Sequence, residues 1–401
     1  MLGTVENVWN NCHVLALVLG SERLLTSQSL HGKRVGIVCN PASVDSHYVN
    51  IVDRIAADRA VQIAAIFGPQ HGFRSDVQEN MIETAHGHDA SRRVPIYSLY
   101  SETREPTQAM LDGLDVLVVD LQDVGTRIYT YIYTMAYCLT AARRNGIRVI
   151  VCDRPNPIGG AQVEGPMLAR GFESFVGLYA IPMRHGMTIG ELARMFNEHF
   201  AIGADLEVVT MHGWTRAMYH DTARAPWVMP SPNMPTLDTA IVYPGTVLFE
   251  GTNVSEGRGT TRPFELAGFP DIHAERFCDR MNTLALPGVF FRPVVFEPTF
   301  HKHAGTACGG CQIHVIDRAA FRPVVTGVAL TAAFRAAAPD RFAWRDPPYE
   351  YEYVKPPIDI LFGSNRLREA LEDGVSPRDI AAEWTGPVAE FNAVRARFLL
   401  Y

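Results

Sequence analysis

The sequence lacks any apolar run of the roughly 18 consecutive residues that a membrane-spanning helix needs. The apolar run nearest the N-terminus, His13–Gly20, is short and follows Glu6 and two asparagines instead of a cationic stretch. No small-residue cleavage site follows it, so we expect neither a membrane span nor a secretory signal. Cysteine is scarce, with seven in 401 residues. Together, the few cysteines and the missing signal predict reduced thiols and a cytoplasmic protein.

An excess of positive charge is missing as well. The chain has 36 lysines and arginines against 43 aspartates and glutamates, for a net charge of −7, which disfavours a nucleic-acid partner. Apolar residues make up 47% and charged residues 20%, which excludes a largely disordered chain. At roughly 100–200 residues per domain, the length predicts two or three domains. No feature indicates a particular oligomeric state.

Nucleotide-binding and hydrolase fingerprints are absent. No Gly-x-Gly-x-x-Gly follows the first predicted strand, and no Gly-x4-Gly-Lys-Ser/Thr or Gly-x-Ser-x-Gly occurs. A nucleotide-dependent transferase or oxidoreductase is therefore the weakest of the enzyme classes considered, and we expect no cofactor. The single Cys308-x-x-Cys311 pair has histidines nearby but no second pair at zinc-ligand spacing, so we also expect no metal.

The first half of the chain alternates short apolar runs with helical patterns. The predicted strands are 34–39, 62–67, 95–99, 116–120 and 148–152, all rich in β-branched residues. The predicted helices are 46–57, 107–113, 131–145 and 188–200. This alternation predicts a Rossmann-like, doubly wound, mostly parallel α/β sheet.

No regular element is expected to span the proline-rich segment 226–244 easily. We place a domain boundary after it, so that residues 1–244 form the Rossmann-like domain and residues 245–401 a smaller α+β domain. In the second domain, 289–296 and 312–316 are predicted strands, and 321–338, 365–372 and 377–390 are predicted helices.

Polar, turn-forming loops follow four of the predicted strands, at residues 40–43, 68–74, 120–127 and 153–157. In an open parallel sheet, ligands bind beyond the carboxyl ends of the strands. These loops are therefore expected to converge on a site, although Asn-Pro and Gly-Pro pairs also occur as plain turn chemistry. A second polar, glycine-rich cluster spans 249–262 and contains two carboxylates, two arginines and an asparagine. It is either a binding loop or a solvated loop with internal ion pairs.

Seven blocks of the sequence resemble the NamZ family, long catalogued as DUF1343. They are Gly68–Arg74, Tyr97–Tyr100, Asp120–Gly125, Asp153–Pro157, Arg184–Thr188, Pro230–Thr236 and the stretch from Glu250–Asn253 to Arg262–Glu265. The resemblance covers residues from about 30 to the C-terminus. It implies an exo-β-N-acetylmuramidase, a hydrolase that releases N-acetylmuramic acid from the non-reducing end of peptidoglycan fragments. It also implies a Rossmann-like domain and a smaller C-terminal domain with the site in the cleft between them.

The chain departs from the family at one position. The family reads Gly-Pro-Glu-His-Gly where this chain has Gln70, and an amide has no proton to give at neutral pH. If that glutamate is the family's acid, three alternatives remain open. The chain is inactive and binds an amino sugar, it uses another acid such as Glu79 or Glu83, or it acts on a different glycoside.

Glycoside hydrolysis usually needs two carboxyl groups, or one acid where the substrate's acetamido group assists. From loop position we predict Glu256 and Asp123 as the principal catalytic pair, from opposite sides of the cleft, and a Glu256→Gln variant that loses turnover but keeps its stability. The lactyl carboxylate of muramic acid needs a cation, for which Arg258, Arg127 and Arg74 are the candidates in that order. The full predicted site has as catalytic residues Glu256, Asp123, Glu83, His71 and Gln70, and as substrate-binding residues Arg74, Asp120, Arg127, Tyr129, Asn156, His185, Asn233, Glu250, Asn253 and Arg258.

Overall fold

A seven-stranded sheet organises the first half of the protein. The computed structural model describes residues 17–79 and 81–401, so that positions 13–16 of the apolar run at His13–Gly20 lie outside it. The strands are β1 (Arg34–Cys39), β2 (Gln62–Gly68), β3 (Gly87–Asp89), β4 (Val94–Ser98), β5 (Val116–Asp120), β6 (Arg148–Cys152) and β9 (Leu206–Val209). Their order is β3-β4-β2-β1-β5-β6-β9, and only the β3–β4 pair is antiparallel. The predicted mostly parallel α/β sheet is confirmed.

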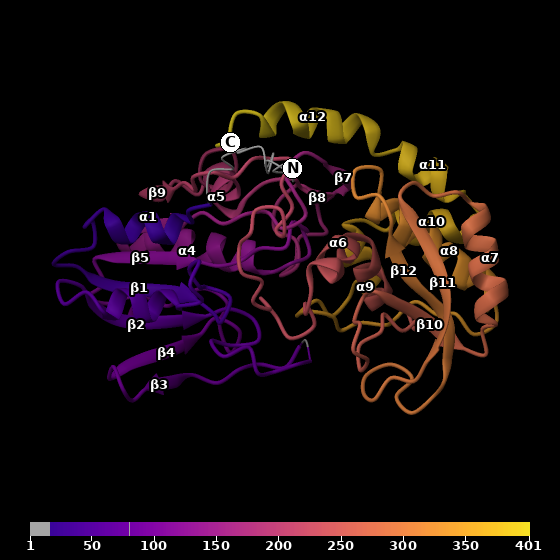
Figure 1. The fold of residues 1–401 in the computed structure, drawn as a ribbon, viewed down its shortest axis with the longest axis horizontal. Coiled ribbons are helices and arrows are strands. Elements are labelled where there is room, and N and C mark those ends of the chain that lie inside the picture. The colour runs from indigo at the N-terminus through magenta and orange to yellow at the C-terminus, as the bar shows by residue number, and fades with distance from the viewer. Residues whose placement is uncertain (1–16, 80) are drawn as a thin grey trace, which may run out of the picture.

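Helices pack around this sheet (Figure 1). They are α1 (Gly20–Thr26), α2 (Ile51–Ala56), α3 (Gln108–Leu111), α4 (Tyr131–Asn145) and α5 (Ile189–Glu198). Helix α4 has the predicted bounds and ends at Gly146, whose φ of 67° is the left-handed value that glycine tolerates best. Helix α5 begins with the predicted capping box of Thr188 and Glu191.

The order of the strands reverses between β1 and β5. From β1 the chain proceeds to β2 and β4 on one side, and from β5 to β6 and β9 on the other. Such a reversal opens a crevice beyond the carboxyl ends of the strands, which is where ligands bind in this class of sheet. A short hairpin of β7 (Glu164–Met167) and β8 (Pro182–Arg184) lies outside the main sheet.

The second half is built on a smaller antiparallel sheet in the order β10-β12-β11. Its strands are β10 (Leu266–Pro270), β11 (Val289–Phe296) and β12 (Cys308–Val315). Helices α7 (Ala274–Thr283), α8 (Pro323–Ala337), α9 (Pro357–Phe362) and α10 (Arg366–Glu372) surround it. One apolar core runs through both halves and includes Tyr133 and Phe196 from the first and Phe334 and Leu361 from the second.

A helix occupies the last part of the proline-rich segment 226–244, although no regular element spans the whole of it. Helix α6 (Leu237–Thr246) begins in this segment, contains Pro244, and continues as the 3-10 helix η1 (Val247–Gly251). Tertiary packing compensates for the missing proline N–H, because α6 crosses α8 in backbone contact. A Cβ on Gly245 would lie 1.9 Å from the Pro323 carbonyl oxygen, so only glycine allows this approach. The predicted domain boundary at residue 245 thus falls inside α6.

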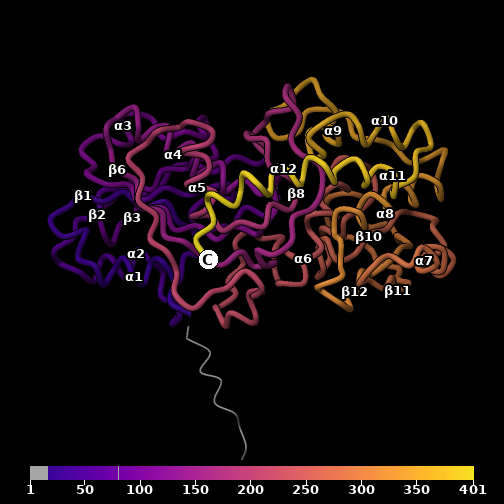
Figure 2. Tube along the Cα trace, turned by 90° about the horizontal axis from the view of Figure 1, so that it is seen from above, coloured from indigo at the N-terminus to yellow at the C-terminus, as the bar shows by residue number. Residues whose placement is uncertain are grey.

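The single helix predicted at 377–390 is two helices, α11 (Pro377–Ala382) and α12 (Thr385–Arg395). Pro387 has no N–H to donate to the carbonyl of Glu383, so a continuous helix would lose a bond there. Helix α12 runs across the molecule and brings the C-terminus onto the first half (Figure 2). There the Tyr401 hydroxyl donates to Asp153, at 2.7 Å. Among the described residues, no helix combines the length and apolar character needed to span a bilayer.

Candidate active site

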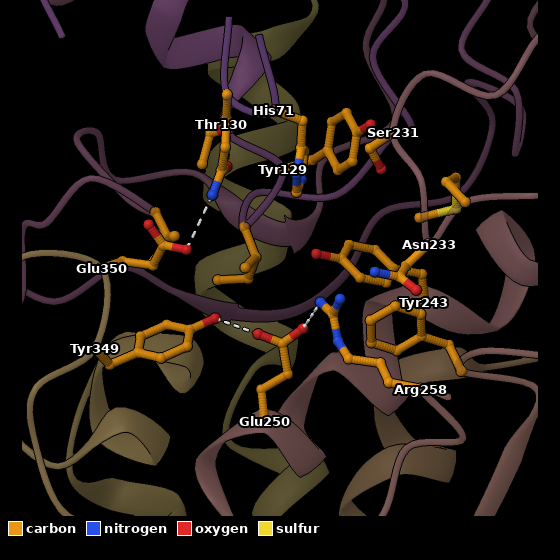
Figure 3. A pocket seen from close by; sticks show the side chains of 15 residues that line it. His71, Tyr129, Thr130, Ser231, Asn233, Tyr243, Glu250, Arg258, Tyr349 and Glu350 are labelled. Carbon is orange, nitrogen blue, oxygen red and sulfur yellow. Dashed lines mark hydrogen bonds and ion pairs between the residues drawn. The ribbon is translucent and has the colours of Figure 1, made fainter. Parts of the chain in front are cut away.

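A pocket with about 450 Å³ of empty space, its open mouth included, lies beyond the carboxyl ends of the sheet, where the two halves of the chain meet. Figure 3 shows the side chains that surround it. Its lining is formed by Gln70, His71, Ile128, Tyr129, Thr130, Val176, Ser231, Asn233, Met234, Tyr243, Glu250, Arg258, Phe264, Tyr349 and Glu350. Of the four predicted loops, only 68–74 contributes residues to this lining. The predicted loop 120–127 does not, but the three residues that follow it, Ile128, Tyr129 and Thr130, do.

The loop after β2 contributes Gln70, which is held on both sides of its amide. The Thr130 hydroxyl, from the loop after β5, donates to Gln70 Oε1 at 2.7 Å. This contact fixes the orientation of the amide, so that Gln70 Nε2 donates to Glu350 Oε1 at 3.0 Å. Gln70 is thus a hydrogen-bond donor to a carboxyl group that lies 280 residues further along the chain.

Glu350 sits on a strained turn. The backbone N–H and C=O of Tyr349 and Glu352 bond reciprocally at 2.9 Å, which closes a two-residue turn. Its central residues, Glu350 and Tyr351, have φ values of 45° and 68°. This left-handed conformation is uncommon for residues other than glycine, and costs on the order of 1–3 kcal/mol per residue. Backbone strain of this kind concentrates at functional sites.

The carboxyl group of Glu350 is almost fully buried. Desolvation raises its pKa to about 7; the hydrogen bond from Tyr100, at 2.7 Å, opposes the shift, and the negative charge of Glu250 adds to it. A carboxyl group with a pKa near 7 carries a proton for much of the time at neutral pH. Glu350 can therefore donate a proton inside the pocket.

Glu250, on η1, is the second carboxyl group of the pocket and has a different environment. Arg258 Nη2 lies 2.6 Å from Glu250 Oε1, and the Tyr349 hydroxyl donates to Glu250 Oε2 at 2.5 Å. In Figure 3 the carboxyl groups of Glu250 and Glu350 face the same space. A carboxyl group held against a guanidinium and one whose pKa is raised by burial form the pattern expected of an acid and a carboxylate with separate roles.

His71 lines the pocket beside Gln70 and is neutral at physiological pH. Burial lowers its pKa to about 4, and the nearby Arg258 charge acts in the same direction. Its ring nitrogen Nδ1 bonds the Val77 carbonyl at 2.7 Å. Of the other predicted binding residues, Tyr129 and Asn233 also line the pocket, and Asn233 Nδ2 donates to the Gln78 carbonyl at 2.8 Å.

Glu256, one of the two residues predicted to do the chemistry, lies behind the pocket in a buried ion cluster. Lys302 Nζ lies 2.7 Å from its Oε2, while His301 Nδ1 and Arg258 Nε each lie 3.3 Å from its Oε1. Although burial opposes it, the charge of Lys302, with His301 and Arg258, holds the pKa of Glu256 well below its usual range. Glu256 thus has no proton to donate near neutral pH, and its carboxylate reaches the pocket wall through Arg258.

Asp123 also lies outside the pocket lining. Its Oδ2 accepts the Gly125 N–H at 2.8 Å and lies 3.3 Å from His185 Nε2, so both predicted site residues hold a buried loop together. Asp120 is fully buried in an ion pair with Arg154, at 2.5 Å. Asn156 bonds the Met187 carbonyl and the Ile158 N–H. These four residues stabilise the carboxyl edge of the sheet instead of facing the pocket.

Two of the three predicted arginines lie elsewhere. Arg127 is fully buried and donates to the carbonyls of Leu361 and Phe362, which joins the two halves of the chain. Arg74 is exposed and does not line the pocket. Only Arg258 places a cation in the pocket wall.

Two other predicted residues also lie outside the pocket. Asn253 bonds the backbone of Arg341 and Ala343, and Glu83 is exposed and accepts from the Tyr351 hydroxyl at 3.1 Å. The two cysteines of the C-x-x-C pair are buried on β12. Within residues 17–79 and 81–401, no three His, Cys, Asp or Glu side chains gather as a metal site requires.

Sequence reasoning missed Glu350, and with it Tyr349, Tyr243, Ser231 and Thr130. The stretch Tyr349–Tyr353 alternates tyrosine and glutamate directly after two prolines. Aromatic residues that alternate with carboxylates in an irregular segment are a signal for a binding loop. That signal does not show which of the two glutamates points inward, because the left-handed turn decides it.

A Rossmann-like sheet and a smaller α+β region share a pocket with two differently held carboxyl groups, an arrangement that fits an enzyme of the glycoside hydrolase class. The chain belongs to the exo-β-N-acetylmuramidase NamZ family. The model of that family's N-terminal part matches residues 35–238, and the model of its C-terminal part matches residues 241–401.

The chain is 46% identical over 375 residues to the peptidoglycan β-N-acetylmuramidase NamZ of Bacillus subtilis. The matched region covers 93% of this chain and 88% of that protein. It is also similar to two solved DUF1343-family structures from Bacteroides fragilis. Each match covers 96% of this chain and 99% of the Bacteroides chain. One is 34% identical with a TM-score of 0.87, and the other 27% identical with a TM-score of 0.75.

Proposed function

We propose that this protein hydrolyses the β-glycosidic bond of N-acetylmuramic acid at the non-reducing end of peptidoglycan-derived fragments, with Glu350 as the general acid. The family and the similarity to a peptidoglycan β-N-acetylmuramidase support the substrate class. The observation that carries the assignment of the acid is the buried Glu350 carboxyl group, with a pKa of about 7, in a pocket that also contains the ion-paired Glu250. Gln70 positions the carboxyl group of Glu350 by a hydrogen bond that by itself lowers the pKa of Glu350, and it gives no proton itself.

The reaction follows from these positions. Glu350 transfers its proton to the glycosidic oxygen while the bond from that oxygen to C1 breaks, and the electron pair stays on the leaving oxygen. Positive charge then develops at C1 and the ring oxygen, near the carboxylate of Glu250. The substrate acetamido group or water attacks C1, and the water that completes hydrolysis returns a proton to Glu350.

Arg258 is the cation that we assign to the lactyl carboxylate of muramic acid. It lines the pocket and is held between Glu250 and Glu256, so its guanidinium is fixed before substrate arrives. The charge of the cluster is balanced, because Arg258 and Lys302 offset the carboxylates of Glu250 and Glu256. With a neutral Glu350, the pocket adds no further repulsion against an anionic sugar.

The test is hydrolysis of para-nitrophenyl β-N-acetylmuramic acid, with the N-acetylglucosamine analogue as control. We expect nitrophenol release from the muramic compound alone. Absence of turnover in a folded sample that binds N-acetylmuramic acid in calorimetry would instead identify a sugar-binding protein that has lost catalysis. Absence of both turnover and binding would mean that the substrate has changed.

The pH dependence of kcat/KM reports the free enzyme's acid. Because Glu350 must be protonated and its pKa is about 7, we expect kcat/KM to fall tenfold per pH unit above about pH 7. The measurement is initial rates from pH 5 to 9 with the disaccharide of N-acetylmuramic acid β-linked to N-acetylglucosamine, whose sugar leaving group needs the proton of an acid. A rate that stays level up to pH 9 would exclude Glu350 as the acid.

The Gln70→Glu variant restores the family's residue and should shift the fall of kcat/KM on the alkaline side (the alkaline limb of the pH profile) to higher pH. Two carboxyl groups at the 3.0 Å separation of Gln70 Nε2 and Glu350 Oε1 cannot both ionise easily, so they share one proton and lose it at higher pH. We expect the limb to shift upward by about one pH unit or more. The control is Gln70→Met, which removes one hydrogen bond but adds no charge and should shift the limb less. An unchanged limb in Gln70→Glu would show that residue 70 does not contact the acid.

A further inference from the structure

A second cavity opens on the other side of Glu350. It has about 640 Å³ of empty space, its open mouth included, and Glu350 is the residue that both cavities share. Its lining is Arg104, Tyr137, Glu173, Ser174, Phe175, Leu178, Glu350, Tyr351 and Glu352. The general acid of a glycosidase must touch the oxygen that joins the two sugar units. Glu350 lines both cavities, so it lies where sugar units in the two cavities would be joined.

We propose that this second cavity is the leaving-group subsite, and that it holds the neutral sugar unit on the reducing side of the cleaved bond. The proposal rests on the proposed function, because it takes Glu350 as the acid. The strained turn provides the geometry: its two left-handed residues place Glu350 in both cavities and Tyr351 in the second alone. We name the cavity the aglycone pocket.

The walls of the aglycone pocket combine aromatic rings with polar groups. Tyr351 packs edge to face against Phe175, with ring centroids 6.2 Å apart, and Tyr137 is a third aromatic residue of the lining. Sugar rings present C–H groups that pack on aromatic side chains, while their hydroxyls need hydrogen-bond partners. Ser174 and the carboxylates of Glu173 and Glu352 supply acceptors for these hydroxyls.

The charge of the aglycone pocket favours a neutral occupant. Arg104 is its one cation among the lining residues, and its guanidinium is engaged, with Cζ 3.6 Å from the centroid of the Tyr351 ring and Nη1 donating to the Ser101 carbonyl at 2.7 Å. Glu173 and Glu352 line the same space, and Lys355 offsets only the second of them, at 3.3 Å. Glu83, whose Oε1 lies 4.0 Å from Arg104 Nη1, offsets that cation, so the carboxylate of Glu173 leaves an excess of negative charge that disfavours an anionic group, whereas a hydroxylated neutral sugar meets acceptors.

The test fills the aglycone pocket without changing the pocket that holds Glu250. Ser174→Trp adds bulk to the lining, and Arg170→Trp adds the same side chain at an exposed position four residues earlier, outside both cavities. The two substrates are para-nitrophenyl β-N-acetylmuramic acid and the disaccharide of N-acetylmuramic acid β-linked to N-acetylglucosamine. We expect Ser174→Trp to lower the ratio of disaccharide kcat/KM to aryl-glycoside kcat/KM at least tenfold, and Arg170→Trp to leave it as in the wild type. An unchanged ratio in Ser174→Trp overturns the proposal.

Binding separates this proposal from the proposed function. In the Glu350→Gln background, calorimetry compares the disaccharide with free N-acetylmuramic acid. We expect the disaccharide to bind more tightly, and Ser174→Trp to remove that gain while affinity for the monosaccharide stays. If the wild-type protein binds the disaccharide more tightly than the monosaccharide but hydrolyses neither substrate, the subsite proposal stands and the proposed activity is wrong. Equal affinities for the two sugars overturn the subsite, whatever the turnover.

Discussion

Glu350→Gln is expected to lower kcat for the muramic glycoside by about 10²–10⁴-fold, the usual contribution of a general acid. The glutamine keeps the volume of the side chain and its hydrogen-bond capacity toward Gln70 and Tyr100, but it has no proton to transfer. KM should change much less than kcat, because the substrate still fits the same pocket. The measurement is steady-state kinetics with the disaccharide of N-acetylmuramic acid β-linked to N-acetylglucosamine, together with the thermal unfolding midpoint.

The size of the loss in kcat should depend on the leaving group of the substrate. Para-nitrophenolate departs with little help from an acid, whereas a sugar hydroxyl needs its proton, so the loss should be larger for the disaccharide than for the aryl compound. Glu79→Gln serves as control, because Glu79 is exposed and lies outside the pocket. If Glu79→Gln or Glu83→Gln abolished turnover and Glu350→Gln did not, the acid would lie on the loop after β2 and our assignment would be wrong.

The fold was predictable wherever the sequence carries a local signal. Buried parallel strands such as β1 and β5 are continuous β-branched runs, and α4 ends at a glycine in the left-handed conformation. Helix α6 had no such signal, because its residues from Thr239 to Thr246 are all buried and it contains Pro244. A helix buried on every side shows no amphipathic period, and its stability comes from packing against α8, which the sequence does not reveal.

The site was predictable only in part, for a similar reason. Gln70, His71 and Tyr129 follow strands whose carboxyl ends meet at one edge, so the topology of the sheet locates them. Glu350 reaches the same pocket from a turn close to the C-terminus, and only the three-dimensional fold brings it to Gln70. Burial also separates carboxylates that look alike in sequence. Glu250 faces the pocket, while Glu256, six residues later, points into the ion cluster behind it.

Glu256 therefore leads to a prediction opposite to the one made from sequence. Its carboxylate has no solvent exposure and neutralises Lys302, whose side chain is 11% exposed and also bonds the carbonyls of Phe249 and Val254. Glu256→Gln leaves that ammonium buried without a full countercharge. We expect the free energy of unfolding to fall by about 3 kcal/mol, at the low end for a broken buried ion pair, because the two carbonyls remain. Chemical denaturation at pH 7 measures this loss.

A matched set of variants decides between a structural and a catalytic Glu256. Glu383→Gln breaks the exposed ion pair with Arg366 and should leave the denaturation midpoint unchanged. The double variant Glu256→Gln/Lys302→Met removes both charges, so it should be more stable than Glu256→Gln alone, since no unpaired ion stays buried. Its activity should be reduced because Arg258 loses one of the two carboxylates that hold it beside Glu250. If Glu256→Gln were as stable as the wild type and had no turnover, Glu256 would be a catalytic residue and the structural assignment would be wrong.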